Sequence, residues 1–174
     1  WALMMEGGIQ VNLAGRRFSN EHEGYSEQGR RVMAQPDGLA WDIFDGRLHE
    51  LGMDFEDFRQ AVEAGAVRAG DSVAELAALC SLPESELGET LEAVARLAAG
   101  EGTDEFGRDF TVNEALRPPY YAVKGTGSLF HTPGGLVVDQ NAPDVKPDGT
   151  PLPHLFAGGG QARGHSGPSD WWSL

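Results

Sequence analysis

Two clusters of glycine are the residues whose spacing could do chemistry most directly. The first is residues 125–127 (GTG), and the second, residues 158–160 (GGG), follows an apolar segment with the pattern of a buried strand. A strand that runs into a glycine cluster can bring backbone N–H groups close to a cofactor, because glycine has no side chain in the way. Neither cluster completes a dinucleotide fingerprint, since Phe130 and Arg163 stand where the third glycine should be.

Other catalytic signatures are missing from the sequence. It has no phosphate-binding loop, no His-Glu-x-x-His arrangement and no Gly-x-Ser-x-Gly elbow. The five histidines show no metal-ligand spacing, so we expect no metal site. The single cysteine, Cys80, excludes an internal disulfide framework, and we expect an inert thiol on an apolar helix face.

The composition describes an acidic chain with enough apolar residues for a core. Among 174 residues, 13 Lys and Arg face 27 Asp and Glu, which gives a net charge of −14. Phosphates would be repelled, so nucleic acid and anionic membrane surfaces are excluded as main partners. No apolar run approaches the ~20 residues that span a bilayer. The chain starts at Trp1 without a signal peptide, so we expect a piece of a longer, cytoplasmic protein.

The elements that would position such chemistry follow from periodicity and turn residues. Strands are predicted at residues 8–13, 39–44, 120–123, 136–139 and 155–157, with a return strand starting at 16–18. Helices are predicted from the Asn20 cap to about Ala34, around 55–62, after a capping box at 72–75, and from Pro83 to Gly100. Turns are expected at residues 45–46 and 148–149, and Trp41, Phe44, Phe55 and Phe58 are expected in the core.

Four segments resemble, in order, the fumarate reductase/succinate dehydrogenase-type FAD flavoproteins. Residues 8–21 (GIQVNLAGRRFSNE) resemble the start of the family's capping domain, and residues 102–108 (GTDEFGR) resemble a loop late in that domain. Residues 130–139 (FHTPGGLVVD) resemble the return to the FAD domain, and residues 148–159 (DGTPLPHLFAGG) the strand and glycine turn that reach the flavin.

This resemblance implies an α+β fold with two parts. Residues 1–130 would be a capping domain of helices and a small sheet, and residues 131–174 an incomplete C-terminal part of the Rossmann-like FAD-binding domain. The implied activity is FAD-dependent hydride transfer to or from a carbon–carbon bond of a small-molecule substrate, next to a carbonyl or carboxylate. Without the missing half, the isolated chain is expected to be colourless and inactive.

The resemblance also assigns roles to individual residues. Tyr25 matches the cap arginine that donates a proton in fumarate-reducing members, and His131 matches a histidine that contacts substrate. Arg163 is a candidate substrate ligand. The implied flavin contacts are Gly158, Gly159, Gly160, Ser166 and Gly167.

Three departures from the family pattern leave the substrate open. Tyr25 replaces the arginine, Asp170 stands near the expected carboxylate-binding arginine, and Gly160 replaces a common flavin-contacting glutamate. An acid at 170 would repel a dicarboxylate, and a phenol as proton donor resembles the ketosteroid dehydrogenases on the same fold. A non-enzymatic, lid-derived binding domain is the further alternative. Tyr120 and Tyr121 are expected to pack within a strand.

Overall fold

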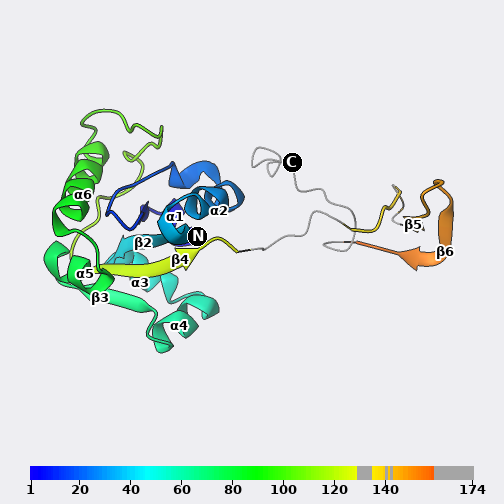
Figure 1. The fold of residues 1–174 in the computed structure, drawn as a ribbon, viewed down its shortest axis with the longest axis horizontal. Helices are drawn as coiled ribbons and strands as arrows, with labels where there is room; N and C mark the ends of the chain where they lie inside the picture. Colours follow the sequence, from blue (N-terminus) through cyan, green and yellow to red (C-terminus); the bar gives the residue numbers. More distant parts are fainter. Residues whose placement is uncertain (129–134, 140, 142, 159–174) are drawn as a thin grey trace. The chain divides into compact units, whose positions relative to one another are not determined.

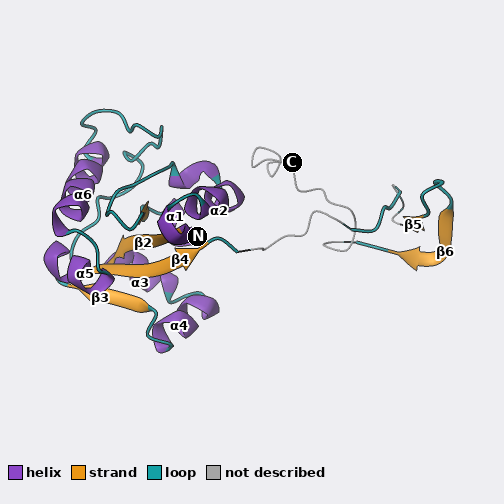
Figure 2. Cartoon of the chain, in the orientation of Figure 1, coloured by secondary structure: helices purple, strands orange, loops and turns teal. Residues whose placement is uncertain are grey.

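The computed structural model describes residues 1–128, 135–139, 141 and 143–158. The chain divides into two compact units, Trp1–Gly127 and Ser128–Leu174. The first unit combines helices with a sheet, whereas the described part of the second consists of strands and loops (Figure 1, Figure 2). This mixture of separate helices and antiparallel strands confirms the α+β class.

Four antiparallel strands form the sheet of the first unit, in the order β1-β2-β4-β3. The central strands β2 (Leu39–Asp45) and β4 (Tyr120–Thr126) pair along their full lengths. The edge strands are β1 (Ile9–Val11), which pairs with β2, and β3 (Val67–Gly70), which pairs with β4. Because β4 follows β3 only after two helices and a long loop, residues far apart in the sequence meet in this sheet.

Helices gather at two ends of this unit. Figure 1 shows α5 and α6 together at the end marked by β3, with α1 and α2 at the other. The helical segments are α1 (Ala2–Met5), the 3₁₀ turn η1 (Glu21–Glu23), α2 (Tyr25–Met33), the 3₁₀ turn η2 (Pro36–Gly38), α3 (Gly46–Gly52), α4 (Glu56–Glu63), α5 (Val73–Cys80) and α6 (Glu84–Ala98).

The apolar core lies between the sheet and the helices. Ile43, Phe44, Leu76 and Leu87 are fully buried in it, and they come from β2, α5 and α6. Trp41 and Phe44 are buried as predicted, and Phe58 packs against the core from α4. Phe55 is 44% exposed, so its predicted place in the core is wrong. It precedes the first residue of α4 and therefore lies outside the helical periodicity that buries Phe58.

The start of α5 forms the predicted capping box in part. Ser72 accepts a hydrogen bond from the backbone N–H of Glu75 at 3.2 Å, as the capping box requires, although the Glu75 carboxylate accepts from Asp71 rather than from Ser72. Cys80 is buried on the inner face of α5, and burial raises the pKa of its thiol to about 11. The small thiolate fraction agrees with the expected inert thiol.

Two predictions around the first strands are wrong. Residues 16–18 form no return strand, because the Arg17 side chain turns inward to the carboxylates of Glu21 and Asp104. Residues 45–46 form no turn either. Asp45 instead caps α3, accepting a hydrogen bond from the backbone N–H of Leu48 at 3.1 Å.

The helix predicted from Asn20 to about Ala34 is present in two pieces. Asn20 caps the short turn η1, as predicted, and accepts from the backbone N–H of His22 at 2.9 Å. Gly24, with φ 109° and ψ 154°, then interrupts the helix, which resumes at Tyr25. This backbone conformation is nearly confined to glycine, which explains why the break falls at Gly24.

The second unit is a small hairpin of β5 (Pro143–Val145) and β6 (Pro151–Phe156). Its turn at residues 148–149 is confirmed, with Gly149 at φ 82°. Residues 136–139 contribute an isolated bridge at Val138 instead of the predicted strand. The strand predicted at 155–157 begins earlier and ends at Phe156, which is 65% exposed, whereas Ala157 is buried. Within the described residues, nothing packs over this face of β6.

Candidate functional site

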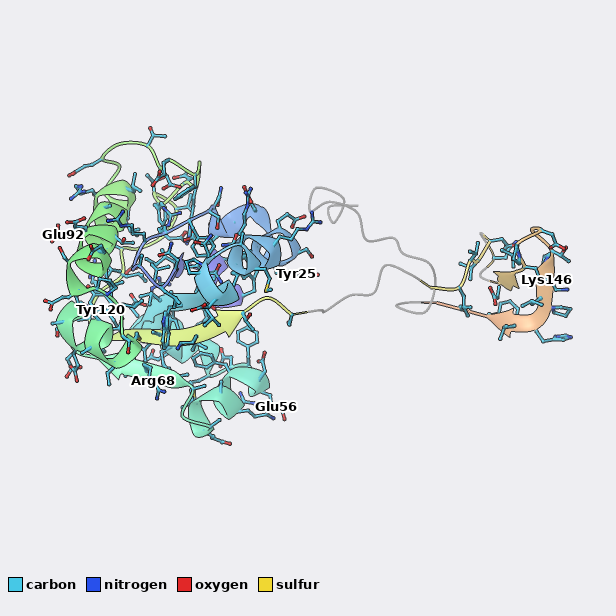
Figure 3. The ribbon with its side chains drawn as sticks, viewed as in Figure 1. Tyr25, Glu56, Arg68, Glu92, Tyr120 and Lys146 are labelled. Atoms are coloured by element: carbon cyan, nitrogen blue, oxygen red, sulfur yellow. The ribbon has the colours of Figure 1, made fainter. Side chains whose placement is uncertain are left out.

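Tyr25 stands at the start of α2, directly after the break at Gly24. Its side chain is 41% exposed, and Figure 3 shows it at the α2 end of the first unit. The same view places Tyr120 at the opposite end, so these two tyrosines do not belong to one site. Tyr121 stacks on His49 with 4.4 Å between ring centroids, which is the strand packing that the sequence predicts.

A fully buried carboxylate lies four residues before Tyr25. Glu21 Oε1 accepts from the backbone N–H of Gln10 at 3.1 Å and from Arg17 Nε at 2.9 Å. Glu21 Oε2 accepts from Arg17 Nη2 at 2.7 Å and from Arg108 Nη1 at 3.0 Å. Each oxygen therefore has two donors, and this compensates the desolvation of a buried charge.

Four buried charges form a neutral cluster around Glu21. Arg17 Nη1 donates to Asp104 at 2.6 Å, and the backbone N–H of Arg108 donates to the same carboxylate at 3.1 Å. Both guanidinium groups also lie over the ring of Phe110. Burial lowers the pKa of Arg17, but hydrogen bonds with Glu21 and Asp104 outweigh it and raise that pKa above its usual value.

The cluster ties together segments that are distant in the sequence. Arg108 donates to the carbonyl of Gly8 at 2.8 Å and to the carbonyl of Met4 at 3.0 Å. Burial lowers the pKa of Arg108, and the charge of Glu21 opposes that effect. The loop after α6 is thereby fixed to α1, to β1 and to the turn that precedes Tyr25.

A second polar network lies beneath α2. Gln28 Nε2 donates to Gln10 Oε1 at 2.7 Å and to Ser19 Oγ at 2.6 Å. Gln10 Nε2 in turn donates to Asp42 Oδ1 at 2.7 Å. Burial raises the pKa of Asp42 to about 6, and the hydrogen bond from Gln10 offsets this only in part. Burial, followed by the charge of Arg108, lowers the pKa of His22.

An open groove of about 630 Å³ lies between α6 and the loop of residues 101–106. Arg16 and Arg17 line it, but Arg16 faces Glu86 at 4.0 Å and Arg17 is held by the buried cluster. Two of the arginines that line the groove are therefore paired with carboxylates, and Arg96 of α6 also lines it. The described residues hold no group of three or more metal-ligating side chains, and none of their helices is long and apolar enough to span a membrane.

Comparison with known proteins decides the family. The pattern that defines the family described as "FAD binding domain" matches residues 2–170. The chain belongs to this FAD-binding family.

Its relatives act on different substrates. A probable fumarate reductase of Shewanella frigidimarina is 28% identical over 153 residues, covering 88% of this chain and 26% of that protein. The urocanate reductase of Eggerthella lenta is 30% identical over 169 residues, covering 90% of this chain and 26% of the relative. A 3-oxosteroid 1-dehydrogenase of Mycobacterium tuberculosis is 27% identical over 197 residues, covering 93% of this chain and 35% of the relative.

A solved structure shares the fold. The open conformation of a flavocytochrome c3 fumarate reductase has a TM-score of 0.69 and 29% identity, covering 92% of this chain and 28% of that chain. The chain thus spans about a quarter to a third of the length of the relatives it matches.

Among the residues predicted to reach a flavin or its substrate, two are described. Tyr25 is the exposed first residue of α2. Gly158 follows the end of β6 and is exposed, and no atom of the described residues lies within 4 Å of a Cβ added there. The other predicted residues lie outside the described ones: His131, Gly159, Gly160, Arg163, Ser166 and Gly167. The predicted set of site residues therefore remains a prediction.

The sequence analysis did not predict the four charges of the Glu21 cluster or the buried Gln28. Arg17 and Glu21 are spaced four apart, which is a signal for an ion pair on a helix, but they lie in a loop and a 3₁₀ turn. Asp104 and Arg108 belong to a segment chosen for its family resemblance alone. Gln28 lies within a helix that was predicted, but it was not recognised as buried.

Proposed function

We propose that residues 1–130 form the capping domain, and residues 131–174 the C-terminal part of the FAD-binding domain, of an FAD-dependent oxidoreductase. The reaction is hydride transfer between flavin and a carbon–carbon bond next to a carbonyl or carboxylate. The observation that carries this proposal is the family match over residues 2–170, together with relatives that are reductases and dehydrogenases of such bonds.

The exposed hairpin of the second unit supports a domain completed by further polypeptide. Leu136, Val137, Leu155 and Phe156 are all at least 43% exposed. A two-stranded hairpin is at best marginally stable in water, and it needs a covered apolar face for independent stability. The relatives contain three to four times the length of this chain, which is room for the remainder of an FAD-binding domain.

Bound FAD supplies or accepts the hydride through N5 of its isoalloxazine ring. The proposed flavin contacts are Gly158, Gly159, Gly160, Ser166 and Gly167. The resemblance of residues 148–159 to the strand and glycine turn that reach the flavin supports this assignment. Backbone N–H groups next to glycine can approach a ring system closely, and they hold it without any side chain.

Tyr25 exchanges the proton on the carbon adjacent to the one that exchanges hydride. In the reducing direction, its phenol gives a proton as the double bond becomes a single bond, and in the dehydrogenating direction it takes one. Its side chain is 41% exposed, and the hydrogen bonds of Glu21 fix the backbone four residues before it. His131 and Arg163 are proposed to bind the substrate.

A ketosteroid-like substrate is the second candidate. The phenol of Tyr25 in place of a cationic side chain favours it, because a phenol brings no positive charge to a dicarboxylate. Asp170 near the expected carboxylate site points the same way. A 3-oxosteroid 1-dehydrogenase is among the relatives.

A flavin titration of the full-length protein tests the function and separates the substrates. The dithionite-reduced protein is mixed without oxygen with fumarate, urocanate or acrylate, and the oxidised protein with 4-androstene-3,17-dione. The proposal expects one of these compounds to change the flavin absorbance rapidly. A full-length protein that binds no FAD, or whose flavin responds to none of the four, would contradict it. Replacement of His131 by alanine should raise KM for the reactive compound.

A further inference from the structure

One residue of β1 holds the backbone on both sides of Tyr25. Four residues before Tyr25, the Glu21 carboxylate accepts from the backbone N–H of Gln10 at 3.1 Å. Three residues after it, the Gln28 amide donates to Gln10 Oε1 at 2.7 Å. Both bonds end on Gln10, so the turn η1 and the first turn of α2 are tied to the same point of the sheet.

Gln10 is itself fixed in one orientation. It is 7% exposed, lies opposite Asp42 in the β1–β2 pair, and donates from Nε2 to Asp42 Oδ1 at 2.7 Å. Its amide must therefore present Nε2 to the carboxylate and Oε1 to Gln28. A reversed amide would face an oxygen with an oxygen at one end and an N–H with an N–H at the other.

The backbone between the two anchors contains a joint. Gly24 has φ 109° and ψ 154° and carries no side chain that packing could hold. Without the bond to Gln28, the first turn of α2 could rotate about this joint and carry Tyr25 with it. The hydrogen bond from Gln28 to Gln10 fastens the first turn of α2 to β1 on the C-terminal side of Gly24.

Gln28 is buried and serves two acceptors. It is 1% exposed, and its Nε2 donates to Gln10 Oε1 and to Ser19 Oγ, while its own Oε1 has no hydrogen-bond partner among the described residues. An apolar side chain at this place would leave the buried oxygen of Gln10 without its donor, which costs about 1–3 kcal/mol, so a test must separate loss of stability from loss of position. We infer that Gln10 and Gln28 are positioning residues that set the place of the Tyr25 hydroxyl for proton transfer, an inference that rests on the proposed function.

The first test is kinetic and uses the full-length flavoprotein. Gln28→Met keeps the length of the side chain and removes its hydrogen bonds. The matched control is Gln35→Met, because Gln35 accepts from Asn12 at 3.1 Å and ties the other end of the same segment to the loop after β1. Gln28→Met should lower kcat about tenfold or more, since a misplacement near 1 Å can cost 100-fold, with KM and FAD content unchanged.

A double variant separates positioning from general damage. A residue that acts only through Tyr25 loses its effect once the hydroxyl is gone, so Gln28→Met in a Tyr25→Phe background should cause no further loss. Full additivity of the two losses, or equal kcat in Gln28→Met and Gln35→Met, would overturn the inference. If Tyr25→Phe alone turns over at the parental rate, the proposed role of Tyr25 fails instead.

The second test measures the surroundings of the Tyr25 side chain by ¹⁹F NMR and does not depend on catalysis. A 3-fluorotyrosine introduced at position 25 of the full-length protein gives one ¹⁹F line. In Gln28→Met this line should shift and broaden or split, while in Gln35→Met it stays as in the parent. An unchanged line in Gln28→Met sinks the inference. Should that variant not fold, Ser19→Ala removes one of the two acceptors of Gln28 and should move the line in the same direction by less.

Discussion

The carboxylate of Glu21 compensates two guanidinium groups in a place that water does not reach. Arg17 and Arg108 both donate to it, and Asp104 completes a neutral set of four charges. Removing one member of such a set leaves a buried charge without its partner. At the scale of single residues, the local structure below Tyr25 thus depends on charge balance as much as on apolar packing.

Glu21→Gln should therefore lower the free energy of unfolding by about 3–5 kcal/mol. The matched control is Glu23→Gln in the same turn, because Glu23 pairs with Arg31 at 3.2 Å where both side chains are at least 36% exposed. Exposed pairs contribute about 0–1 kcal/mol, so the control should change little. Urea unfolding followed by circular dichroism measures both, and equal losses would disprove the buried role of Glu21.

Asp42 makes stability depend on pH in the opposite sense to an ordinary carboxylate. Its pKa of about 6 in the folded protein lies above the ordinary 3.8, so between these values the folded protein holds a proton that the unfolded chain has lost. The free energy of unfolding falls as the pH rises through this range, and the cost is fully present above pH ~6.

Asp42→Asn should remove that cost while keeping an oxygen that accepts from Gln10. We expect a gain of about 1–3 kcal/mol near neutral pH and no gain below pH ~4, where Asp42 is protonated in both states. Thermal unfolding of parent and variant across this range measures the difference. A gain that does not vary with pH would show that Asp42 is not the titrating group.

Sequence resemblance predicts a role for Tyr25, but it did not predict the buried charges around Glu21. Arg16 and Arg17 are adjacent and chemically identical, yet the first side chain is 67% exposed and the second 7%. Local spacing carries no information about this difference, because the partner that turns Arg17 inward, Asp104, is 87 residues away. The same holds for Gln28, whose acceptor on Gln10 belongs to a strand.

At the scale of the elements, the break at Gly24 sets where α2 begins, and Tyr25 is the first residue of that helix. Asn20 as a cap was predictable, and so was the helix ending before Pro36, because side-chain capping and proline act locally. The interruption was missed since glycine within a helical pattern is often tolerated. Only its φ of 109° shows that the two pieces point in different directions.

Two glycines at this element should respond oppositely to alanine. Gly24→Ala forces a side chain into a region reserved for glycine and should cost about 1–3 kcal/mol of unfolding free energy. Gly29→Ala lies within α2 with nothing within 4 Å of the new Cβ, and should stabilise by about 0.5–1 kcal/mol. Chemical denaturation measures the free energy of unfolding of both variants. A Gly24→Ala variant as stable as the parent would contradict the backbone conformation given for Gly24.

At the scale of the whole molecule, the chain is two units of different character. The first has a sheet, flanking helices and a core of its own. Periodicity predicted α6, which buries Leu87, Leu91 and Val94 at helical spacing, but the short helices α1 and α3 were missed. The hairpin of the second was misread as buried, because strand-like apolar runs are typical of buried strands whether or not the covering segments are present.

Phe156 should behave differently in the two contexts. In the 174-residue chain it is 65% exposed, so Phe156→Ser should leave thermal stability unchanged there. In the full-length protein, where we propose that further polypeptide covers the hairpin, the same change should cost about 3 kcal/mol or more and release flavin at a lower temperature. Flavin fluorescence on heating measures that release. An identical release temperature in parent and variant would argue against a covered hairpin.

The most direct test of the account is the rate at which substrate oxidises or reduces the flavin of the full-length Tyr25→Phe variant in a stopped-flow instrument. The variant lacks only the hydroxyl, so FAD content and substrate binding should match the parent. The flavin reaction should be slowed about 100-fold or more, because a positioned acid or base usually contributes that much. A parental rate with the reactive substrate would contradict the role of Tyr25 and the proposed mechanism with it.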